Sequence, residues 1–148
     1  MLSIEIPDQY GWVLLTVGAL PTLTNFMMMG PVMVARKKYN VKYPNLYATP
    51  GHHEKADEFN RVQRGHQHLF ETISDFRVNA LIGGLKYPVL TACCGVAYSV
   101  GSYLYMMGYA DNKNDVKLAR YKKGGGLKWI GSLVVMGCSI MSAVSFLK

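Results

Sequence analysis

Five ionisable side chains recur at helical spacing in the middle of the chain. They lie alternately three and four residues apart within residues 57–85: Arg61, Arg64, His68, Glu71 and Asp75. On a helix this spacing places all five on one face. Arginine pairs with carboxylates or phosphates, imidazole donates or accepts hydrogen bonds, and a carboxylate can bind an ammonium group. The stripe therefore predicts a binding site for a zwitterionic or anionic small molecule.

Four hydroxyl-bearing side chains repeat in the same way along the next segment. At intervals of four, three and four residues they are Tyr98, Ser102, Tyr105 and Tyr109. A tyrosine near a helix end is typical of the interfacial belt of a membrane protein, and Tyr109 alone fits that pattern. Tyr98 and Tyr105 lie deeper in their segment, where a phenol needs a hydrogen-bond partner. Packed against the ionisable stripe, this face would complete a polar crevice between two helices.

Long apolar segments must position these side chains. Three stretches contain no charged residue: 10–35, 87–110 and 129–147. Each is long enough to cross a bilayer, because about 20 helical residues span the hydrocarbon core. We expect three crossing helices, the last beginning near residue 125. Lys128 and Lys148 flank this last segment, which predicts that they anchor it at the membrane surface.

The placement of positive charge indicates how the chain crosses the membrane. The net charge is +7, and basic residues concentrate in two loops, 36–55 and 111–128. Basic loops on one side of a membrane satisfy the positive-inside rule, so this charge calls for no nucleic-acid partner. We expect both loops on the cytoplasmic side. They can share a side only if residues 57–85 cross the membrane as well.

Two interpretations of residues 57–85 remain open. A helix lying on the membrane surface would keep its charges in water. A crossing helix would place them at membrane depth, at about 2.5 to 3.5 kcal/mol each unless they face protein, a wet cavity or one another. Because the topology favours crossing, the sequence predicts an all-α integral membrane four-helix bundle. Its apolar side is expected to include Val62, Leu69, Ile73 and Phe76.

The remaining residue types suggest no other chemistry. Cys93, Cys94 and Cys138 fall inside expected crossings, where cysteine packs as a small hydrophobic residue more often than it reacts. No spacing typical of a metal site is present. Three glycines at 124–126 lack the lysine and threonine of a nucleotide-binding loop, so they are interpreted as a hinge or helix entry.

Several stretches resemble the MAPEG superfamily, in particular its type-three microsomal glutathione transferases. The similarity covers nearly the whole chain, so residues 1–148 are interpreted as one MAPEG-like domain. The stretches are YGWVLLT at 10–16, ARKKYNVKYPNLYAT at 35–49, FNRVQRGHQHLFE at 59–71 and the tyrosine-bearing segment 98–109. The resemblance implies a left-handed four-helix membrane bundle that assembles as a homotrimer. It also implies that glutathione binds as co-substrate between helices of adjacent subunits, in the endoplasmic reticulum or another organelle membrane.

The resemblance also implies a set of site residues. The expected glutathione contacts are Arg36, Arg64, His66, His68, Glu71, Tyr105 and Tyr109. His68 stands where the family usually has asparagine, and it could still hydrogen-bond a carboxylate or carbonyl. The family's chemistry uses a cation near the start of the last crossing helix to stabilise the glutathione thiolate. Among Lys117, Arg120, Lys122 and Lys123, Arg120 is chosen because it is the only arginine after Arg77. The surrounding loop is longer than the family's.

Three functions follow from these patterns. The leading one is a glutathione transferase or peroxidase that acts on lipophilic electrophiles or lipid hydroperoxides arriving from membrane lipids. The departure at His68, together with the change in sequence after Glu71, leaves a second one open, a non-catalytic accessory subunit of a larger membrane complex. A channel or proton relay that uses the ionisable stripe is the third.

Overall fold

A computed structural model describes residues 5–147, and within this range all regular structure is helical. A continuous helical stretch runs over Tyr10–Lys38. It consists of α1 (Tyr10–Val13), a π-helical segment η1 (Leu14–Ala19) and α2 (Leu20–Lys38). The other helices are α3 (Ala56–Gly84), α4 (Pro88–Tyr109), α5 (Val116–Lys122) and α6 (Leu127–Ser145). Lys148, expected as an anchor, lies outside the described residues.

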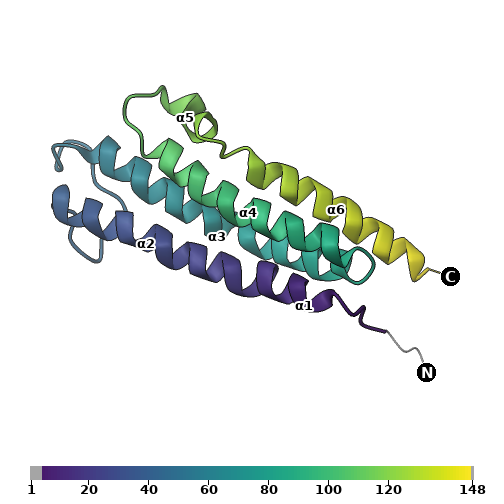
Figure 1. Ribbon diagram of the computed structural model, residues 1–148. Helices are drawn as coiled ribbons and strands as arrows, with labels where there is room; N and C mark the ends of the chain where they lie inside the picture. Colours follow the sequence, from purple (N-terminus) through teal and green to yellow (C-terminus); the bar gives the residue numbers. More distant parts are fainter. Residues whose placement is uncertain (1–4, 148) are drawn as a thin grey trace.

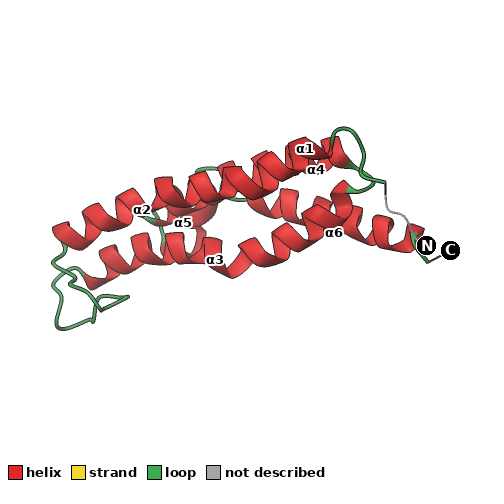
Figure 2. Ribbon diagram, turned by 90° about the horizontal axis from the view of Figure 1, so that it is seen from below, coloured by secondary structure: helices red, strands yellow, loops and turns green. Residues whose placement is uncertain are grey.

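The long helical segments lie side by side and alternate in direction (Figure 1). The loop 39–55 joins α2 to α3 at one end of the molecule, and a tight turn joins α3 to α4 at the other end. The segment 110–126, which includes α5, returns the chain to α6 at the first end (Figures 1 and 2). Both basic loops therefore lie at the same end of the molecule (Figure 1), which is the arrangement that a shared side of the membrane requires.

Three helices among the described residues are long and apolar enough to cross a membrane. They are Tyr10–Lys38, Pro88–Tyr109 and Leu127–Ser145. Their outward faces carry large exposed apolar side chains, including Phe26 and Leu133. Such faces are stable against lipid rather than water. The charged helix α3 is not among the three candidates, yet it packs against all of them.

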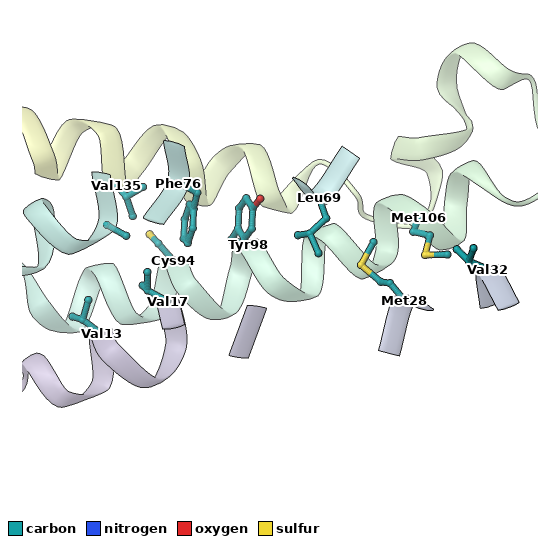
Figure 3. Packing of buried hydrophobic residues seen from close by; sticks show 11 residues of the cluster. Val13, Val17, Met28, Val32, Leu69, Phe76, Cys94, Tyr98, Met106 and Val135 are labelled. Carbon is teal, nitrogen blue, oxygen red and sulfur yellow. The ribbon is translucent and has the colours of Figure 1, made fainter. Parts of the chain in front are cut away.

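The buried core runs along the axis between the long helices (Figure 3). Its members come from every long segment: Val13, Val17, Met28, Val32, Leu69, Phe76, Ala80, Cys94, Tyr98, Met106 and Val135. The rings of Phe76 and Tyr98 stack with centroids 4.0 Å apart. Leu69 and Phe76 thus take the apolar role that their spacing predicted, and Val62 and Ile73 pack against the cluster. Cys94 and Cys138 are buried, Cys93 is exposed, and all three thiols are free.

Glycines let the last helix approach α4 closely. A Cβ atom on Gly101 would lie 2.2 Å from the backbone nitrogen of Lys128, so only glycine fits there. On Gly125, a Cβ would lie 2.1 Å from the Arg120 carbonyl oxygen and 2.7 Å from the Tyr105 Cα. Gly124 has φ +92°, a left-handed conformation that favours glycine. The glycines at 124–126 are a helix entry, as the sequence indicated.

Two sequence expectations are wrong. The segment between the last two crossings was expected to be a loop, yet Val116–Lys122 forms a seven-residue helix, α5. The Asp115 carboxylate begins it by accepting a hydrogen bond of 2.9 Å from the Lys117 backbone N–H. Lys128 was expected at the membrane surface, but it is 1% exposed. Its backbone is drawn against α4 at Gly101, so its side chain is enclosed between helices.

Candidate functional site

Three side chains of the ionisable stripe form one cluster on α3. Arg64 donates to the Glu71 carboxylate, and His68 Nδ1 lies 3.1 Å from the other Glu71 oxygen. The three residues are brought together because they are four and three residues apart on a helix. The Arg64 and Glu71 side chains are 42% and 40% exposed, whereas His68 is 13% exposed. The cluster therefore offers a cation and an anion at the surface of the chain.

The tyrosines of α4 adjoin this cluster. The His68 and Tyr105 rings stack with centroids 4.5 Å apart. The Tyr105 and Tyr109 rings also stack, with centroids 6.2 Å apart. The predicted contact between the ionisable face of α3 and the hydroxyl-bearing face of α4 is thus present at these residues.

Helix α5 brings Arg120 to the same tyrosines. Its guanidinium donates to the Tyr105 hydroxyl over 3.5 Å and lies 5.7 Å from the Tyr109 ring centroid. The hydroxyl acceptor raises the pKa of Arg120 above its ordinary value, so the guanidinium keeps its charge. Hydrogen bonds of 3.3 Å to the Lys117 carbonyl hold the guanidinium close to its own helix. Arg120, the basic residue chosen from the sequence, therefore lies at Tyr105.

A second cation, Lys128, lies on the inner side of Tyr105 and was missed as a site residue. Its ammonium donates to Thr72 Oγ1 over 2.9 Å and lies 5.3 Å from the Tyr105 ring centroid. A lysine that flanks an apolar segment is ordinarily read as an anchor, which hid this role. One signal was available: Gly101 lies on the tyrosine face of its helix, and a small residue there permits close approach by another helix.

The two end residues of the ionisable stripe, Arg61 and Asp75, are not part of this cluster, because their side chains lie against other parts of the structure. The Arg61 guanidinium donates to the carbonyls of Tyr109 and Asp111 over 2.7 Å each and to that of Asn114 over 3.2 Å. These bonds satisfy carbonyls at and after the C-terminus of α4, so Arg61 caps that helix. Asp75 lines a separate groove between α3 and α6. The predicted continuous stripe of five is therefore a cluster of three.

Arg36 and His66 do not reach the cluster within the chain. The Arg36 guanidinium donates to the Asn45 carbonyl over 2.8 Å and lies 4.5 Å from the Tyr43 ring centroid. It thereby orders the loop 39–55. His66 Nε2 is 2.8 Å from Asn25 Oδ1, so its imidazole faces α2. The other predicted contacts, by contrast, are neighbours in space.

An open pocket leads to the cluster from the end that carries the basic loops. Its lining comes from the loop 39–55, α3, α4 and α5: Tyr47, Asp57, Asn60, Arg61, Arg64, Tyr109 and Val116. The pocket has a volume of about 560 Å³. Both Arg64 and Tyr109 line it, so the charged face of α3 and the tyrosine row of α4 are reached from one opening. We call this opening the outer pocket.

Apolar membrane-length helices around a polar, ionisable cluster define the class of integral membrane proteins. The model of the MAPEG family matches residues 13–141, which include the whole cluster. The chain belongs to the MAPEG family, whose membrane proteins include glutathione transferases and glutathione peroxidases.

Proposed function

We propose that the protein is a membrane-bound glutathione transferase or peroxidase of the type-three microsomal kind. One observation carries the proposal: Arg64, Glu71 and His68 on α3 lie against Tyr105 on α4, which also contacts Arg120 on α5. Glutathione is a zwitterionic tripeptide with two carboxylates, one ammonium and one thiol. The cluster offers a complementary charge for each type of group.

The polar groups divide into binding and activating roles. Arg64 would pair with a glutathione carboxylate and Glu71 with its ammonium, while His68 and Tyr109 would hydrogen-bond other parts of the tripeptide. Arg120 and the Tyr105 hydroxyl would stabilise the thiolate, which is the nucleophilic form of a thiol. The thiolate would attack an electrophilic carbon, forming a C–S bond as the leaving group departs. With a lipid hydroperoxide it would attack the terminal peroxide oxygen, breaking the O–O bond to release the lipid alcohol and leave glutathione sulfenic acid. A second glutathione would then convert this acid to glutathione disulfide and water.

The membrane arrangement follows from the same charges. We infer that α3 crosses the bilayer with the three apolar helices in a four-helix bundle, with loops 36–55 and 111–128 on the cytoplasmic side. The exposed Arg64 and Glu71 side chains would be costly against lipid. A neighbouring subunit would cover them, which supports the homotrimer implied by the family resemblance. It would also allow Arg36 and His66 to act as glutathione contacts from adjacent subunits. The organelle would be the endoplasmic reticulum or another internal membrane.

Calorimetry with glutathione tests the proposal directly. Purified protein in lipid nanodiscs should bind glutathione, and the bound ligand should show the ultraviolet absorbance of a thiolate. Arg64→Met should weaken glutathione binding, because it removes the cation proposed to pair with a carboxylate. Arg120→Met should reduce the thiolate absorbance, because it removes a cation proposed to stabilise the thiolate. Absence of heat and of thiolate absorbance in the unmodified protein would exclude the glutathione function. Particle mass in the same nanodiscs measures whether the protein is a trimer.

A non-catalytic accessory subunit is the second candidate. It is favoured by the pairing of Glu71 with both Arg64 and His68, which already satisfies this carboxylate without a ligand. This candidate predicts stable co-purification with a larger membrane complex. Arg64→Ala and Glu71→Ala should leave that co-purification unchanged. Free trimers that lose activity in the same variants would exclude it.

A further inference from the structure

The most deeply buried cation of the described residues is Lys128, in the first turn of α6. It is 1% exposed, and its ammonium has one hydrogen bond, to Thr72 Oγ1. The rings of Tyr98, Tyr105 and Trp129 surround it, with centroids 5.2, 5.3 and 5.4 Å from Nζ. Within residues 5–147, no carboxylate forms a salt bridge with it. A charge enclosed in this way needs a physical reason.

The packing of α6 on α4 fixes where this cation lies. Lys128 meets α4 at Gly101, where any side chain would collide with its backbone nitrogen. Tyr98 and Tyr105 lie on either side of Gly101 along the same face of α4, and Thr72 faces them from α3. A lysine that snorkels would extend its ammonium toward water along the helix surface. Here the ammonium lies between three helices instead.

The surroundings of Lys128 compensate its charge only in part. Burying a cation costs several kcal/mol, and the faces of aromatic rings return part of this. An ammonium group has three N–H donors, of which one is used here. A nearby anion would supply the remaining compensation, and it would in turn be favoured by the cation.

Tyr105 contacts both this cation and residues of the candidate site. Lys128 lies near its ring, His68 stacks on it, and Arg120 donates to its hydroxyl. The charged and titratable groups that face Lys128 from the packed elements are His68 and Glu71 on α3 and Tyr98 and Tyr105 on α4. Arg120 on α5 contacts the hydroxyl of the same Tyr105. Two cations therefore contact Tyr105, the partly exposed Arg120 at its hydroxyl and the buried Lys128 at its ring.

We propose that Lys128 is a positioning residue that supplies the inner positive charge of the site, favouring the thiolate of glutathione held at the Tyr105 hydroxyl. Lys128 acts across the Tyr105 ring without touching the ligand, and its bond to Thr72, which also bonds the Tyr98 hydroxyl, fixes the ammonium at that ring. This inference rests on the proposed glutathione function and adds a cation that the family pattern of basic residues did not indicate. In this arrangement the charges of Arg120 and Lys128 both stabilise the thiolate, so removing one of them should raise the pKa of the bound thiol by a measurable amount.

A pH titration of bound glutathione tests this role. The absorbance of the thiolate is followed against pH in nanodiscs for the unmodified protein, Lys128→Met, Lys128→Arg and the control Lys86→Met. Lys86 is exposed at the other end of the bundle, so its variant makes the same exchange away from the site. In Lys128→Met the midpoint should rise by about one pH unit, a tenfold loss of thiolate at neutral pH. Lys128→Arg should recover part of this shift, and Lys86→Met should show none.

Binding of S-methylglutathione separates the thiolate from the rest of the tripeptide. This ligand has no ionisable thiol, so its affinity should stay within about twofold in Lys128→Met. If the thiolate titration of Lys128→Met has an unchanged midpoint while the variant still binds S-methylglutathione, Lys128 contributes to packing only and the proposal is overturned. If the unmodified protein binds neither ligand, the glutathione function itself fails.

Two further variants keep the test decisive. Lys128→Gln removes the charge but retains a donor for Thr72, so it replaces the methionine variant if that one does not fold. The same upward shift is expected, and an unchanged midpoint overturns the proposal. Thr72→Val removes the hydrogen bond but keeps the charge, so it should lower the unfolding temperature with little change in the midpoint.

Discussion

The two sides of α3 use polar residues in different ways. On the side that faces the first helical stretch, Arg77 donates to the carbonyls of Val17 and Gly18 over 3.2 Å each and to Thr22 over 3.0 Å. Pro21 has no N–H, so it cannot provide the bond that Val17 would receive in a regular α-helix. Arg77 therefore supplies donors from another helix to backbone carbonyls next to this proline.

On the other side, toward α4 and α6, donor capacity remains. His68 Nε2 is buried without a partner, and Lys128 uses one of its donors. Arg64 and Glu71 pair with each other while remaining partly exposed. A polar group whose partners lie within the chain holds helices together, whereas a polar group with spare capacity can hold a ligand. The comparison indicates that Arg77 stabilises the helix packing, and it supports the binding role proposed above for Arg64, His68 and Glu71.

The largest effect should come from Arg77→Met, which removes the hydrogen bonds between α3 and the first helical stretch. It removes three donors to oxygen atoms of the first helical stretch. Hydrogen bonds to charged groups contribute about 1.5 to 3 kcal/mol, so the free energy of unfolding should fall by about 3 kcal/mol. Denaturant-induced unfolding in detergent micelles measures this loss. The glutathione affinity of the remaining folded protein should not change, and a selective loss of binding would contradict the assignment.

The next largest effect should come from Gly101→Ala, which moves the start of α6. The added Cβ would lie 2.2 Å from the Lys128 backbone nitrogen. A forced backbone shift of this kind costs about 2 kcal/mol of stability and should draw Lys128 away from Tyr105. Gly137→Ala is the control, because nothing lies within 4 Å of its Cβ position. Equal stability of the two variants, measured by thermal unfolding, would contradict the close approach.

Helix positions could be predicted from sequence because apolar length and charge placement both depend on the bilayer. The expected segment 57–85 agrees closely with α3 at Ala56–Gly84, although hydropathy does not select it. The helix α5 could not be predicted, because seven residues outside an apolar segment give little periodic signal. Its existence depends on the Asp115 cap and on packing beneath Gly108, whose Cβ would lie 2.5 Å from the Ala119 carbonyl oxygen.

The site was predicted in part, for a reason that lies in helix geometry. Spacing groups Arg64, His68 and Glu71 because neighbours on one helix face are set by local geometry alone. Spacing also grouped Arg61 with them, but a long side chain reaches whichever carbonyls the tertiary structure presents, and these belong to the end of α4. The burial of Lys128 depends on how closely two helices approach, and no local pattern fixes that distance.

Glu71→Gln should have a moderate effect, confined to binding. It removes the negative charge proposed to hold the ammonium of glutathione and should weaken binding about tenfold, equivalent to about 1.4 kcal/mol. The Arg64–Glu71 pair is partly exposed, and exposed pairs contribute about 0 to 1 kcal/mol, so stability should change little. Calorimetry compares this variant with Asp75→Asn, from the same helix but outside the cluster. A similar loss in both would indicate a general charge effect rather than a contact.

The smallest effect should come from Asn25→Leu, which tests whether His66 contributes to stability alone or also to binding. It removes the oxygen that lies 2.8 Å from His66 Nε2 and should lower the free energy of unfolding by about 1 kcal/mol. Because His66 faces α2 in the protomer, glutathione affinity should stay the same in calorimetry. A loss of affinity without further loss of stability would show that His66 reaches the ligand, in agreement with the family resemblance. The side of α3 that faces α2 would then contribute to binding in the assembled protein, with His66 acting on the site of a neighbouring subunit.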